Sequence, residues 1–261
     1  MKMRILVGLC VWFAFNVSAE LLVYEGFNYG IVTDFEHNIA NADAAGGSGF
    51  SAAGWRQYNI KVTAAGLVET STGLYSPPGL AATDGYMKIS GGGSGNTWAL
   101  RRISPTYPMH ADGTYYFSVV LKDEDTDTSH SADGAKLVLR SGKGSTIAFV
   151  GFSDMEALIA ACGTSPQVNG RSIIRRGGVV ILVGKLVLSA SGPDTVYASA
   201  FTGSAPVQEP SSWDLSTSSE LAYATLAEIG LNVNGGNSEV DFDEVRMGTT
   251  FTDVIPVQTG N

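Results

Sequence analysis

Three acidic residues late in the sequence have a spacing that could support catalysis. Glu239, Asp241 and Glu244 lie within the segment EVDFDEVRMG. Alternate side chains of a β-strand share one face, and a bulge can bring a third carboxylate onto that face. Two carboxylates about 5–5.5 Å apart can cleave a glycosidic bond with retention. In this interpretation Glu239 and Glu244 are the catalytic pair, one as the nucleophile and the other as the acid/base, and Asp241 assists.

The same segment also has a structural interpretation, which we favour. Four apolar residues alternate with the acids: Val240, Phe242, Val245 and Met247. The step from Phe242 to Val245 is three residues, so a bulge at Asp243 and Glu244 would keep all four apolar side chains inward. The acids would then point to solvent, or Glu244 would pair with Arg246. No aromatic residues that could line a sugar cleft lie near this segment.

Alternating apolar patterns recur along most of the chain and predict further strands. Examples are TYYFSVVLK, AKLVLRS, TIAFVGF, VVILVGKLVLSA, TVYASAF and AEIGLNVN. The chain has 32 glycines and nine prolines, and turn-forming residues separate these runs. Short alternating runs between turns indicate an all-β fold, namely an antiparallel two-sheet jelly-roll sandwich. A helical turn is plausible only at residues 154–162, DMEALIAAC.

Several segments together resemble a known family. LLVYEGFNY, GTYYFSVVLK and VDFDEVRMGTTFTDVIP occur in the order seen in secreted bacterial proteins with a concanavalin A-like, laminin-G-like sandwich. The E-x-D-x-x-E spacing also resembles the catalytic strand of laminarinase-like retaining glucanases. The resemblance implies a jelly roll whose first and last strands pair. It implies no particular reaction, because this fold carries lectins, glucanases and adhesion modules.

The N-terminal residues have the pattern of an export signal. Lys2 and Arg4 precede an apolar run, and Val17-Ser18-Ala19 offers a small-x-small cleavage site. We therefore expect a signal peptide at residues 1–19 and one sandwich domain at residues 20–261. The chain would then be periplasmic or extracellular, and we expect no membrane insertion because the run is too short to span a bilayer.

Charge and cysteine content narrow the range of partners. The formal net charge is −9, and an acidic surface repels the phosphate backbone, so we expect no nucleic-acid partner. The same charge would repel sulfated or uronic polysaccharides unless a cation bridged the two. Cys162 would be the cysteine left after signal cleavage, and we predict that it is a small buried hydrophobic residue.

The strongest cluster of acids lies at residues 122–134, KDEDTDTSHSADG. Asp123, Asp125 and Asp127 have the opening spacing of a calcium loop. Thr128 and Gly134 occupy positions where an EF-hand requires glycine and glutamate, so the segment is not an EF-hand. A looser calcium site remains an alternative to a solvated hairpin loop, and we expect no other cofactor or metal.

Aromatic side chains in loop-like sequence are the remaining candidates for ligand binding. Sugars stack their C–H faces on such rings, and we select Trp213, Trp55 and Tyr107 as candidates. Trp98, within the alternating segment TWALRRI, is expected in the core.

These patterns predict an exported, non-catalytic module that binds carbohydrate or another extracellular surface partner. The alternative function is a retaining glycoside hydrolase that uses Glu239 and Glu244. The sequence gives neither the ligand nor the oligomeric state.

Overall fold

A computed structural model describes thirteen stretches of the chain. They are residues 19–28, 46–60, 68–71, 77–82, 85–91, 96–109, 112–124, 134–142, 144–153, 157–172, 177–221, 225–235 and 239–257. The predicted signal peptide lies almost wholly outside the described residues. Over the described stretches the chain forms fifteen β-strands and one short helix.

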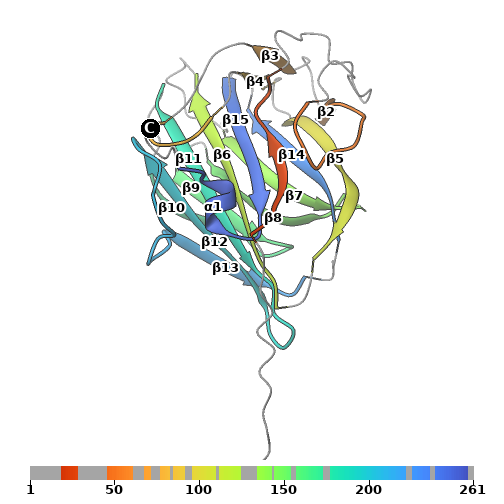
Figure 1. Ribbon diagram of the computed structural model, residues 1–261, viewed down its shortest axis with the longest axis vertical. Helices are drawn as coiled ribbons and strands as arrows, with labels where there is room; N and C mark the ends of the chain where they lie inside the picture. The colour runs from red at the N-terminus through yellow and green to blue at the C-terminus, as the bar shows by residue number, and fades with distance from the viewer. Residues whose placement is uncertain are drawn as a thin grey trace, which may run out of the picture.

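The strands form two antiparallel sheets that lie one behind the other (Figure 1). The eight-stranded sheet has the order β13 (Leu215–Ser219), β12 (Asp194–Thr202), β11 (Val179–Val187), β6 (Thr114–Asp123), β15 (Glu239–Gly248), β4 (Tyr86–Ser90) and β3 (Val68–Ser71), and β1 (Leu21–Glu25) also pairs with β15. The seven-stranded sheet has the order β10 (Val168–Ser172), β9 (Ala157–Cys162), β8 (Thr146–Phe152), β7 (Gly134–Ser141), β14 (Thr225–Asn234), β5 (Asn96–Pro108) and β2 (Arg56–Ile60). The predicted two-sheet sandwich is therefore confirmed.

A hydrophobic core fills the space between the sheets. Alternate residues of each strand point into it, so one face of every central strand is apolar. Phe117, Leu121 and Phe242 come from the eight-stranded sheet, and Leu137 and Leu231 come from the seven-stranded sheet, all with no exposed surface. Cys162 is also fully buried in this core with a free thiol, as predicted.

Strand β15 contains the predicted bulge. Its pairing with β6 shifts register between Asp243 and Arg246, and Glu244 has a φ of 50°. Such a φ is uncommon for a residue with a Cβ and is tolerated where the surroundings fix it. All four apolar residues, Val240, Phe242, Val245 and Met247, are buried in the core. The predicted pairing of the first and last strands is also confirmed, because Tyr24 lies opposite Arg246.

The helix α1 (Phe251–Val254) covers the outer face of the eight-stranded sheet (Figure 1). Phe251 and Val254 join a second buried cluster with Tyr116, Val120 and Ile181. The Ser118 hydroxyl donates a 2.8 Å hydrogen bond to the Val254 carbonyl, which fastens the helix to β6. This sheet is therefore apolar on both faces at its centre.

One secondary-structure prediction is wrong in its described part. Residues 157–162 form strand β9 where a helical turn was expected. The alanine and leucine residues there favour a helix locally, but every residue of the strand is buried, and β9 pairs with β8 and β10. Pairing and burial override intrinsic propensity in such a position. Within the described residues, no helix is both long and apolar enough to cross a bilayer.

Candidate functional site

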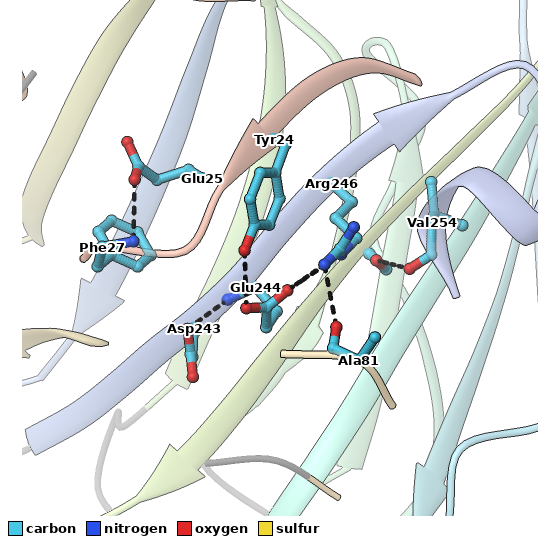
Figure 2. A network of polar contacts seen from close by, with 9 residues as sticks. Tyr24, Glu25, Phe27, Ala81, Asp243, Glu244, Arg246 and Val254 are labelled. Atoms are coloured by element: carbon cyan, nitrogen blue, oxygen red, sulfur yellow. Dashed lines mark hydrogen bonds and ion pairs between the residues drawn. The ribbon is translucent and has the colours of Figure 1, made fainter. Parts of the chain in front are cut away.

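The carboxylates of β15 are held in a network with its neighbours. Figure 2 shows that the Tyr24 hydroxyl donates to Glu244 at 3.1 Å, while Arg246 donates to the same carboxylate at 2.5 Å. Arg246 also donates to the Ala81 carbonyl at 3.1 Å, and its guanidinium lies 4.2 Å from the centre of the Tyr24 ring. Glu244 therefore joins β1, β15 and the segment that contains Ala81.

The prediction that these acids point to solvent is wrong for three of them, whereas the alternative that Glu244 pairs with Arg246 is confirmed. Asp241, Asp243 and Glu244 each expose 1% of their surface or less. The bulge brings Glu244 under Tyr24 and Arg246, and Asp241 lies between Lys88 and Lys122 on the neighbouring strands. These neighbouring side chains cover the acids while their positive charges offset the buried negative charge.

Glu239 is the more accessible acid, with 38% of its side chain exposed. It forms a 2.7 Å ion pair with Lys88, and this hydrogen bond raises the pKa of the Lys88 ammonium group. Glu244, by contrast, is 1% exposed and is bonded by both Tyr24 and Arg246. A retaining glycosidase needs both carboxylates open to the same glycosidic bond, so this arrangement does not suit the glycosidase mechanism.

The candidate aromatic residues lie in three different environments. Trp55 is fully buried, its indole N–H donates to Glu25 at 3.1 Å, and it offers no surface to a ligand. Tyr107 is half-buried, with its ring edge-on to Tyr115. Trp213 is half-buried against the cluster beneath α1, on the outer face of the eight-stranded sheet. The structure therefore brings these three residues to no common site.

The proposed calcium loop is described only at its start. Asp123 is buried at the end of β6, whereas Asp125 and Asp127 lie outside the described residues. Within the described part of the chain, no group of three or more His, Cys, Asp or Glu side chains is placed to hold a metal ion. The calcium site stays a prediction.

The outer face of the seven-stranded sheet has a different character. On β5, β7 and β14, core residues such as Ala99, Leu139 and Ile229 alternate with residues that point away from the core. These outward residues include the basic side chains Arg102, Lys136 and Arg140, and the adjacent strand β2 contributes Arg56. We call the outer surface around Arg56, Arg102, Lys136 and Arg140 the arginine face.

A hollow of about 640 Å³ lies in the arginine face and is lined by Arg56, Arg102, Arg140 and Glu228 together with small and apolar residues. Glu228 bonds Arg56 at 2.6 Å through one carboxylate oxygen and Arg140 at 2.5 Å through the other. Glu228 lies directly opposite Arg102 on β5 and Arg140 on β7, so the three form one row across the sheet. Three guanidinium groups and one carboxylate leave the hollow with a net positive charge.

Two hydrogen-bonding groups at the hollow have no partner among the described residues. The Ser141 hydroxyl is buried without one, and Ser141 as a residue is 5% exposed. Arg56 Nε is likewise buried without a partner. The exposed side chain of Arg102 forms no hydrogen bond or ion pair within the described part of the chain. Arg102 therefore keeps its guanidinium donors available to a polar ligand in the hollow.

Trp98 lies beside the hollow, and the expectation that it is a core residue is wrong. It belongs to the outward-facing set of β5 and is half-buried. A Cβ built on Gly230 would lie 3.1 Å from the Trp98 ring, so the glycine lets the indole lie against the sheet. The guanidinium of Arg140 is 5.4 Å from the ring centre, within range of a cation–π contact. The indole N–H is buried and has no hydrogen-bond partner among the residues that the structure describes.

Lys136 extends the positive charge along β7. Its ammonium nitrogen is 5.1 Å from the centre of the Phe149 ring, and burial lowers the pKa of this lysine. This face was not predicted from the sequence, although TWALRRI and AKLVLRS contain a signal for it. Trp98 and Arg102 are an even number of residues apart on one strand, as are Lys136 and Arg140 on another, so each pair shares one strand face.

Comparisons with known proteins agree on the fold. No protein-family model and no curated protein matches this sequence. Among solved structures, the endo-β-1,4-glucuronan lyase of the fungus Trichoderma reesei is similar with a TM-score of 0.50 at 13% identity, covering 76% of this chain and 93% of that one.

Two further solved structures are similar over most of their length. The metal-free Emp46p carbohydrate recognition domain has a TM-score of 0.44 at 8% identity, covering 74% of this chain and 87% of that chain. A lectin from Bauhinia forficata in complex with GalNAc has a TM-score of 0.41 at 7% identity, covering 74% and 97%. Identities this low show the fold alone, and the pairing of the strands shows that this fold is an all-β, antiparallel two-sheet jelly-roll sandwich, as predicted.

Proposed function

We propose that this chain is a carbohydrate-binding β-sandwich module whose ligand lies on the arginine face. The observation that carries the proposal is the hollow lined by Arg56, Arg102, Arg140 and Glu228, with the Trp98 indole flat against the sheet beside it. Sugar ligands need such a combination of aromatic surface for C–H faces and fixed polar groups for hydroxyls. The role is non-catalytic, and the module is exported through the leader predicted at residues 1–19.

The charged side chains of the hollow are already positioned in the free protein. Glu228 holds Arg56 and Arg140 from opposite sides, and Arg140 also donates to the Gly144 carbonyl at 2.9 Å. Because these long side chains are already fixed before binding, less side-chain conformational entropy is lost when a ligand binds. The arrangement therefore suits recognition of an extended ligand laid across β5, β14 and β7.

A glycan-array screen of residues 20–261 tests this function. The wild-type chain should bind at least one class of glycan, and Trp98→Ala should reduce that signal roughly tenfold, as expected when a stacking contact worth about 1.4 kcal/mol is lost. Trp213→Ala is the matched control, because Trp213 lies on the outer face of the other sheet.

Two results would count against the proposal. If the folded wild-type chain binds no glycan, the proposed carbohydrate-binding function is wrong. If Trp98→Ala and Trp213→Ala lose binding equally while both remain folded, the ligand does not bind specifically at the arginine face. The screen should be run with calcium and with a chelator, because the acidic loop at residues 122–134 remains a candidate calcium site.

A further inference from the structure

We infer that the ligand of the arginine face is a polyanionic glycan whose carboxylates are bound by Arg102 and its neighbouring arginines, that is, a polyuronate. This inference rests on the proposed function and names its ligand class. The net charge of the whole chain is −9, which would disfavour such a ligand if the charge were evenly spread. The distribution is uneven, because Glu228 is the sole acid among the described outward-facing strand residues of this sheet.

The positive groups differ in how much of their bonding capacity is already used. Arg140 is occupied by Glu228 and the Gly144 carbonyl. Arg56 uses one nitrogen for Glu228 and keeps Nε without a partner. The Arg102 side chain is exposed and makes no hydrogen bond or ion pair within the described part of the chain. A guanidinium presents five donors in a planar fork that fits a carboxylate with two parallel hydrogen bonds, so Arg102 is the principal anion-binding residue.

The spacing of the cations favours a polymer with repeated charges. Arg102 and Arg140 flank Glu228 on three neighbouring strands, and two strand spacings are roughly 9–10 Å. A chain of uronic acid residues laid across these strands would place successive carboxylates along this row of cations. Lys136 lies four residues from Arg140 on the same face of β7 and adds a further positive position along the strand.

The aromatic side chain beside the hollow favours a sugar backbone over other polyanions. Trp98 is half-buried and supplies an apolar ring surface on which a sugar face can stack. Nucleic acid carries one charge per roughly 1.7 Å of duplex, far denser than the few cations here. A long nucleic acid would also run onto the acidic remainder of the surface, which repels it.

Polyuronates and their methyl esters provide the decisive ligand pair, because esterification removes the charge and keeps the sugar chain. Polygalacturonate, alginate and polyglucuronate, each as free acid and as methyl ester, should be titrated calorimetrically into residues 20–261 in a chelating buffer. We expect at least one free acid to bind at least tenfold more tightly than its ester. Arg102→Gln should weaken binding of that acid roughly tenfold or more, in line with loss of a charged hydrogen-bond pair.

Two variants distinguish specific recognition by the Arg102 guanidinium from a general effect of positive charge. Arg102→Lys keeps the charge but loses the planar fork, so it should restore only part of the affinity. Lys88→Gln removes one positive charge from the other sheet and should leave affinity unchanged. Thermal unfolding of each variant shows whether it is folded, and Arg102 is exposed enough that its replacement should have little effect on folding.

Each remaining outcome would overturn the inference. Equal binding of the acid and ester forms would show that the protein binds glycan without recognising its carboxylates. In that case the proposed function would still hold. Tighter binding of dextran sulfate or single-stranded DNA than of every polyuronate would show selection for sulfate or phosphate. Loss of polyuronate binding in the chelator would show a bridging cation in place of direct arginine contacts. Failure to bind any glycan, charged or neutral, would remove both the inference and the proposed function.

Discussion

The two sheets share one core, but their outer faces differ. On the eight-stranded sheet, α1 and the cluster around Tyr116 and Phe251 cover the outer face with apolar contacts. On the seven-stranded sheet, the outer face carries a hollow lined by arginines. The contrast indicates that one outer face contributes to folding, while the other leaves its polar groups available for a ligand.

The charged residues of the two faces show the same difference. Glu244 on β15 is buried and has both Tyr24 and Arg246 as partners, and Glu239 is paired with Lys88. On the arginine face, the Arg102 side chain has no hydrogen-bond or ion-pair partner within the described part of the chain. Its guanidinium donors are therefore available to a ligand.

Removal of a core side chain should have the largest effect, and it should act on stability. Phe242 has no exposed surface and packs between the sheets. Phe242→Ala should lower the free energy of unfolding by about 3–5 kcal/mol through lost burial and a residual cavity. Glu239→Gln, on the same strand but half-exposed, should change it by only about 0.5 kcal/mol. Urea denaturation measures both, and similar losses in the two variants would contradict the structural role of β15.

Disruption of the Glu244 ion pair should come next in size. Glu244→Gln leaves Arg246 without its anionic partner in a site where Glu244 is 1% exposed. Removal of one member of a buried pair typically costs about 3 kcal/mol or more. Stability should therefore fall while the folded fraction keeps its glycan affinity. If Glu244→Gln kept full stability but lost glycan binding, the ligand would have to bind at β15. The eight-stranded sheet would then be the binding sheet, contrary to our assignment.

The smallest effect should appear in the pH dependence of binding. Burial lowers the pKa of Lys136 from the ordinary lysine value of 10.5, so this ammonium group loses its proton at a lower pH than an exposed lysine does. As pH rises through that lowered pKa the charge disappears, and affinity for a polyuronate should decline before pH 10.5, while the arginines stay charged. Titration at several pH values should show this decline in the wild type and its absence in Lys136→Met.

Much of the fold could be predicted from local patterns. The three-residue step between Phe242 and Val245 predicted the bulge in β15, and the alternation of apolar residues predicted the central strands. Residues 157–162 could not be assigned in this way, because AlaLeuIleAlaAlaCys suits either a helix or a buried strand until its pairing with β8 is known. The fold class therefore followed from the sequence more reliably than the individual elements.

The candidate site was harder to predict, because it depends on register between distant strands. Arg101 and Arg102 are adjacent, yet Arg101 points inward to pair with Glu25 and Arg102 points outward. With arginine on both faces, the alternation in TWALRRI does not show which side Trp98 takes. The contact between Glu228 and Arg140 joins residues far apart in the chain, and only the pairing of β14 with β7 brings them together.

Hydroxyl-radical footprinting tests the central claim most directly, because it reports which aromatic side chains a bound ligand shields. The folded chain should be oxidised with and without the polyuronate that binds most tightly. The account predicts that the ligand protects Trp98 and Phe149 on the arginine face and leaves Trp213 and Tyr24 unchanged. Protection of Trp213 or Tyr24 with no change at Trp98 would show that the ligand binds the other sheet and would contradict the account.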